Sequence, residues 1–166
     1  MRNRRGQICV FLLAATMVYS VPAFAEQQCK PVVGSFEAHV VPVVDGCTSP
    51  VGLCTAGRVW GGIQGNYAFT MTNAFPNGEP TVPTVFFFTG HSVVTLKSGD
   101  VVLGTDTGAI DLQTPPAVGG FASLITFHPG GTGSTANATG QIRLRGDFDP
   151  AAGTTSGDYL GTICTP

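Results

Sequence analysis

Charge is scarce in this chain of 166 residues: Lys, Arg, Asp and Glu together make up 11% of it, against about 25% in ordinary soluble domains. Lysine occurs twice and glutamate three times, although helices usually take their solvent-facing side chains from these residues. After residue 25 no cluster of Lys or Arg occurs, so the electrostatic footprint of a nucleic-acid-binding protein is missing. No apolar run reaches the roughly 20 residues that a membrane-spanning helix needs.

The start of the chain has the three parts of a secretory signal peptide. An arginine-rich beginning is followed by apolar residues 8–21 and by Ala23-Phe24-Ala25, the small-x-small pattern that signal peptidase reads. We therefore expect cleavage after Ala25 and a secreted domain, periplasmic or extracellular, at residues 26–166. That domain keeps five basic and ten acidic residues, a formal net charge of −5.

Cysteine is infrequent, and its number becomes even once the predicted signal is removed. The four remaining residues are Cys29, Cys47, Cys54 and Cys164. An even count in a secreted chain indicates two disulfides, for which three pairings are possible. We favour Cys47–Cys54, which closes a short loop, and Cys29–Cys164, which ties the chain ends together. The alternative of a zinc site lacks a Cys-x-x-Cys pair and clustered histidines.

The remaining pattern is that of short strands joined by turns. Thr, Val and Phe are plentiful and suit a pleated, half-buried surface. Strands are expected at residues 33–41, 58–64, 66–73, 84–97 with a break near Gly90, 101–103, 108–113, 119–127, 139–148 and 156–164. Eight or nine such strands predict an all-β domain. We expect a single antiparallel meander closing as an eight-stranded, calycin-like barrel rather than a sandwich, because closure removes edges that few charges here could protect.

Two segments carry a family resemblance. Residues 57–69 read GRVWGGIQGNYAF, and the second segment runs from GGTG at residues 130–133 through ATGQIRLRGDFD at residues 138–149 to GDYLG at residues 157–161. These glycine and turn positions resemble bacterial secreted proteins of the allene oxide cyclase-like barrel group, fold relatives of plant allene oxide cyclases and dirigent proteins. The resemblance implies an eight-stranded barrel whose central cavity, in the plant relatives, binds apolar ligands and guides a cyclisation or coupling. It assigns no catalytic residue here.

Acidic residues and one histidine are the candidate acid–base groups. Glu37 and His39 share one face of a strand and would act together if that face lined a cavity. The more ordinary interpretation places them outside, opposite the apolar alternate residues of the same strand. Asp106 and Asp111 could act as a carboxylate pair or bind calcium, but the ligand ladder of an EF-hand is missing. Turn capping is the commoner role of such aspartates.

Aromatic side chains are the candidate ligand-binding groups. Trp60, Tyr67, Phe69, Phe86 and Phe88 could line an apolar pocket. Plain core packing is the commoner explanation. Arg143 and Arg145 could clamp a carboxylate ligand, although they alternate with apolar residues in a way that favours outward, solubilising side chains.

Three functions fit this pattern. The first is a barrel that binds a small apolar molecule, and the second is an isomerase or cyclase that needs no metal or organic cofactor. The third is an extracellular structural or adhesive module, and a homo-oligomer is compatible with each. A cavity of roughly 300 Å³ or more, the lower range for ligand pockets, would favour the first two functions. An inward acid is needed for the second, and a filled barrel favours the third.

Overall fold

The computed structural model describes residues 27–166 of the chain. The predicted signal peptide and its cleavage site lie outside the described residues. The elements are β1 (Gln28–Val40), η1 (Val43–Asp45), β2 (Cys54–Gly61), β3 (Gly65–Pro76), β4 (Val85–Leu96), β5 (Val101–Asp111), β6 (Gly119–His128), η2 (Gly133–Thr135), β7 (Thr139–Asp149) and β8 (Thr154–Thr165).

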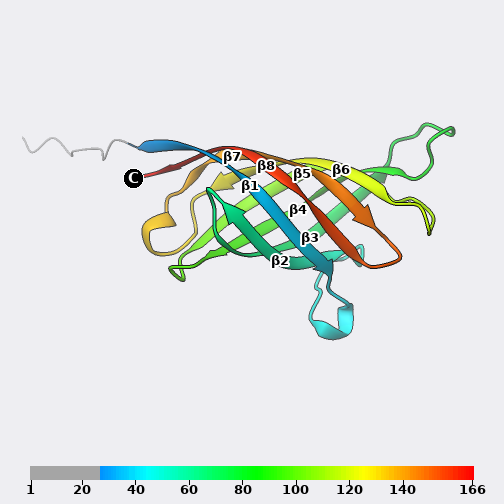
Figure 1. The fold of residues 1–166 in the computed structure, drawn as a ribbon, viewed down its shortest axis with the longest axis horizontal. Helices are drawn as coiled ribbons and strands as arrows, with labels where there is room; N and C mark the ends of the chain where they lie inside the picture. The colour runs from blue at the N-terminus through cyan, green and yellow to red at the C-terminus, as the bar shows by residue number, and fades with distance from the viewer. Residues whose placement is uncertain (1–26) are drawn as a thin grey trace, which may run out of the picture.

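The eight strands form a closed antiparallel barrel in which each strand pairs with its neighbours in the chain, and β8 returns to pair with β1 (Figure 1). The closing pair is long, since its register runs from Gln28 opposite Thr165 to His39 opposite Thr154. Within residues 27–166, closure of the barrel leaves no unpaired edge strand. The predicted all-β meander and its closure into an eight-stranded barrel are confirmed.

Two strands are continuous where the sequence predicts an interruption. The break expected near Gly90 is absent, and β4 runs through it because Gly90 faces inward and leaves space for the ring of Phe69. The two segments predicted at residues 101–103 and 108–113 are one strand, β5, whose residues pair with β4 on one side and β6 on the other. Residues 104–107 show no strand pattern in the sequence, but hydrogen bonds from β4 and β6 hold them in the strand.

β3 also continues further than expected, to Pro76, through residues predicted to lie in a loop. Its register with β4 shifts between Met71 and Asn73, which is a β-bulge. A bulge inserts one extra residue and reverses which alternate residues face the interior. Phe75 therefore lies outside the barrel, opposite Phe87, and both side chains are exposed.

Both predicted disulfides are present. Cys29 and Cys164 lie opposite each other in the β1–β8 pairing and join the two ends of the barrel sheet. Cys47 and Cys54 close the loop before β2. Across residues 27–166 no helix is long and apolar enough to cross a membrane.

The two ends of the barrel differ. The end with both described chain termini is closed by the segments at residues 62–64 and 129–138, at the left of Figure 1. Tyr159 is fully buried in this half; its hydroxyl accepts a hydrogen bond from the backbone N–H of Ile63 at 2.7 Å and lies 3.1 Å from the carbonyl oxygen of Trp60. Ile125 and Ala138 are also completely buried. This half is a packed core.

The opposite end, which we call the loop end, carries the connections at residues 41–53, 77–84, 112–118 and 150–153. Side chains do not fill the barrel interior completely near this end, and the remaining space is a pocket. An eight-stranded barrel is just wide enough to be filled by side chains or to hold one small ligand. Here side chains fill the end that carries the chain termini, whereas the loop end holds the pocket.

Candidate functional site: an apolar pocket with one buried carboxyl group

The pocket lies inside the barrel, in the half toward the loop end, and is partly open to solvent. All eight strands contribute to its wall, and a single loop residue, Leu53, joins them. The lining side chains are mostly aromatic or aliphatic: Phe36, Leu53, Thr55, Tyr67, Phe69, Met71, Phe88, Asp106, Ile110, Phe121, Ser123, Phe148 and Thr155. This composition is typical of small-molecule sites, which are mainly apolar and carry a few placed polar groups.

The aromatic rings of the wall pack against one another. Phe69 and Phe88 meet edge to face with centroids 5.6 Å apart, and Phe36 and Phe121 do so at 5.8 Å. Phe36 also lies 6.3 Å from Tyr67, at a tilted angle. Edge-to-face pairs are favourable beyond their buried area. The wall is therefore supported by contacts among its own rings.

Asp106 is the one ionisable carboxylic acid of the wall, and it is buried, with 2% of its surface exposed. Its Oδ2 accepts a hydrogen bond from the hydroxyl of Ser92 at 3.2 Å, and the oxygen of Ser92 lies 3.3 Å from the hydroxyl of Tyr67. Because Ser92 donates its only proton to Asp106, Tyr67 donates to Ser92. Oδ1 of Asp106 has no hydrogen-bond partner among the described residues.

Burial raises the pKa of Asp106 to about 6. The nearby hydroxyls of Ser123 and Ser92 and the backbone N–H of Thr107 offset part of this rise. Burial, with a smaller contribution from the neighbouring charge of Asp106, raises the pKa of Tyr67 far above its ordinary value. Tyr67 therefore stays a neutral hydrogen-bond donor, while Asp106 can gain or lose a proton near neutral pH.

The pocket is small. The cavity volume is about 40 Å³. One water molecule needs about 10–15 Å³, so the pocket has room for about three waters. This volume lies well below the roughly 300 Å³ that would favour a binding or catalytic barrel, so pocket size by itself favours the structural or adhesive module. A ligand of ordinary size would have to extend outward between the loops or displace side chains at the loop end.

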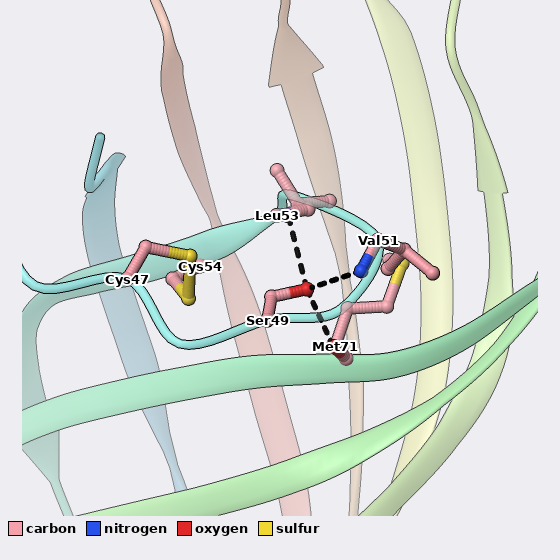
Figure 2. The surroundings of a disulfide bond; sticks show 6 residues. All are labelled: Cys47, Ser49, Val51, Leu53, Cys54 and Met71. Carbon is pink, nitrogen blue, oxygen red and sulfur yellow. Dashed lines mark hydrogen bonds between the residues drawn. A yellow bond between two sulfur atoms is a disulfide. The ribbon is translucent and has the colours of Figure 1, made fainter. Parts of the chain in front are cut away.

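The disulfide loop before β2 lies beside strand β3 and supplies Leu53 to the pocket wall (Figure 2). Ser49 organises it: its hydroxyl donates to the carbonyl oxygen of Met71 at 2.6 Å and accepts from the backbone N–H groups of Val51 and Leu53. The N–H of Met71 in turn donates to the carbonyl oxygen of Leu53 at 3.0 Å. Leu53 is held as an extension of β2, and its side chain lines the pocket.

The candidate pair Glu37 and His39 lies on the outer face of β1, and both side chains are exposed. Phe36 and Ala38, on the alternate positions, are buried inside the barrel. The outward interpretation of this strand is confirmed. Glu37 and His39 are therefore not brought to the pocket.

The candidate aspartates, Asp106 and Asp111, lie on opposite faces of β5. Asp106 lies in the middle of β5 and faces inward, so turn capping is the wrong interpretation for it. Asp111 ends the same strand on the opposite face, where its Oδ2 accepts from the side chain of Gln113. Residues five apart in a strand face opposite sides. The two carboxylates therefore form no pair, and Asp106 acts alone.

The aromatic candidates also divide. Tyr67, Phe69 and Phe88 line the pocket, whereas Phe86 packs against the core without lining it. Trp60 lies on the outer surface, with 44% of its side chain exposed, because it alternates with the inward Val59. Trp60 is thus wrongly placed among the pocket candidates.

Sequence reasoning missed the polar partners of the site. Ser92 and Ser123 come from β4 and β6, the two strands that flank β5. Their register positions opposite Gly104 and Gly108 put them beside Asp106 on the inner surface. Isolated serines in a strand carry no local signal, so only the strand pairing could have identified them. Arg143 and Arg145 are exposed outside the barrel.

Taken together, fold and site define a closed eight-stranded antiparallel barrel with an apolar interior pocket and one buried acid. Within residues 27–166 no group of three or more His, Cys, Asp or Glu is placed to hold a metal ion. Comparison of the chain with protein-family models, with curated proteins and with solved structures finds no match.

Proposed function

We propose that this chain is a secreted barrel protein that binds a small, largely apolar molecule in the pocket at its loop end. The observation that carries the proposal is the wall itself, because five phenylalanines and a single buried carboxyl group surround free space inside the barrel. A purely structural barrel would gain stability by filling that space. The two disulfides support an oxidising compartment, in line with the expected signal peptide.

The size of the pocket constrains the ligand. Its apolar body must be small, or only one end of a longer molecule can enter the pocket. The most efficient small ligands gain about 1.5 kcal/mol per non-hydrogen atom. For about four atoms this limits Kd to tens of micromolar or weaker. Titrations must therefore reach millimolar concentrations.

Methyl NMR tests the proposal directly. We expect 1-propanol, added to millimolar concentration, to shift the methyl signals of Leu53, Met71 and Ile110, which line the pocket. The methyl signals of Val102 and Ile125, in the packed half, should stay in place. If all methyl signals move together, site-specific binding of 1-propanol is refuted, and if the pocket methyl signals do not move, the pocket does not bind a small neutral alcohol.

A pair of variants on one strand sharpens this test. Ser123→Leu places a larger side chain in the pocket, whereas Ala122→Leu adds its bulk on the exposed outer face of β6. Binding should be lost in the first variant and kept in the second. Binding that survives Ser123→Leu would place the ligand elsewhere. Native mass spectrometry of protein from its own host is the complementary search for a retained ligand.

A second candidate, an isomerase or cyclase, is favoured by Asp106. A buried carboxyl group whose pKa is about 6 can take up and release a proton near neutral pH, as general acid–base catalysis requires. If a ligand retained by the protein is converted by the native barrel and not by Asp106→Asn, this candidate replaces simple binding.

A further inference from the structure

The carboxylate of Asp106 has no positively charged partner among the described residues that line the pocket. Buried charges in proteins are normally paired, since removing them from water is costly. Among the described residues that line the pocket, none is Lys, Arg or His. Ser92 donates a hydrogen bond to Oδ2, and the nearby hydroxyl of Ser123 and N–H of Thr107 also favour the charged form, but Oδ1 has no hydrogen-bond partner among the described residues.

We infer that the pocket selects a protonated aliphatic amine, whose ammonium group pairs with Oδ1 of Asp106 while its apolar body lies among the phenylalanine rings. This inference rests on the proposed function and names the ligand class for the same site. An ammonium group supplies both a positive charge and N–H donors. A neutral alcohol supplies a donor only, and a carboxylate would bring like charges together.

The surrounding rings favour the same ligand class. The face of an aromatic ring attracts a cation that lies within about 6 Å of its centre. Phe36, Phe69, Phe88 and Phe121 belong to the wall that also contains Asp106. The hydroxyl groups of wall residues provide further acceptors for an ammonium group, which carries three N–H donors.

The Tyr67–Ser92–Asp106 relay keeps the acceptor oriented. Tyr67 donates to Ser92, and Ser92 donates to Oδ2, so both hydroxyl protons are used in the relay. Oδ1 has no partner among the described residues but is itself buried, so an incoming donor reaches it only when neighbouring side chains of the wall shift. A ligand that supplies the missing positive charge restores the pairing that the wall itself lacks.

The size of the pocket indicates a short chain. Room for about three waters accommodates an amine of about three or four non-hydrogen atoms. A longer amine can enter head first, with its tail extending past the loop end. Propylammonium is therefore a suitable probe, and 1-propanol and propionate are matched to it in size.

The experiment compares these three probes by methyl NMR at pH 7.5, using the signals of Leu53, Met71 and Ile110 on the pocket wall. We expect propylammonium to bind at least tenfold more tightly than 1-propanol and propionate to bind more weakly than either. Equal binding of the amine and the alcohol overturns the inference while leaving the proposed function standing. If neither molecule binds, the proposed function fails and the inference fails with it.

Two variants locate the effect. Asp106→Asn should reduce the preference for propylammonium over 1-propanol to threefold or less. Asp147→Asn removes an exposed carboxyl group from the outer face of β7 and should leave the preference for propylammonium unchanged. A tenfold preference that survives Asp106→Asn excludes Asp106 as the partner. Should Asp106→Asn fail to fold, the comparison of the three probes on the native sequence still decides the inference.

Discussion

Relative to the native sequence, Asp106→Asn should become more stable as the pH rises from acid to neutral. The pKa of this group is about 6 in the folded protein, against an ordinary value of 3.8 in an unfolded chain. Each unit of pKa difference corresponds to about 1.4 kcal/mol, so the difference at this one group amounts to about 3 kcal/mol.

The direction follows from proton binding. Between about pH 4 and pH 6 the folded barrel keeps a proton on Asp106 that the unfolded chain has already released. The folded state therefore loses stability as the pH rises through this window, and the loss is complete somewhat above pH 6. Asp106→Asn has no such titration. The free energy of unfolding of the variant minus that of the native sequence should rise by about 2.4 kcal/mol from pH 4 to pH 7.

Urea denaturation followed by far-ultraviolet circular dichroism, with both disulfides intact, measures this difference at each pH. Other titrating groups are shared by the two proteins and cancel in the subtraction. Asp147→Asn is the control for removing one negative charge, because that side chain is exposed. A difference that stays constant within about 1 kcal/mol across the window would refute the assignment of Asp106 as a buried, proton-retaining acid.

Three further changes test the fold. Replacing both Cys29 and Cys164 by Ser should lower the free energy of unfolding by about 3–5 kcal/mol in chemical denaturation, because their bridge closes a loop of 135 residues in the unfolded chain. Tyr159→Phe leaves the backbone N–H of Ile63 without its buried acceptor and should cost about 1–3 kcal/mol, measured in the same way. Gly90→Ala adds a Cβ that overlaps the neighbouring phenylalanine ring on β3, so we expect a loss of about 1–3 kcal/mol and a lower Tm in calorimetry. Unchanged stability in any one variant would contradict the contact it removes or creates.

The class of fold was readable from the sequence because its signals are local. Alternation of apolar and polar residues at 139–148 and 33–41 identifies strands within a few residues, and scarce Lys and Glu argue against helices. The pairing of Cys47 with Cys54 follows from their closeness in the chain. Cys29 and Cys164 are at opposite ends, and the prediction that they meet depended on expecting a closed barrel, which the structure confirms.

The sequence named Asp106 as a candidate acid but did not predict its inward position, because β5 has no apolar alternation between residues 104 and 108, where Gly, Thr and Asp follow one another. Hydrogen bonds from β4 and β6 make this stretch a strand and turn Asp106 inward. The serines beside it come from those two strands, at positions that only the register defines. Alternation determines which residues share a face. Which face becomes the interior, and which half of the interior stays open, was decided by barrel closure and by the packing around Tyr159.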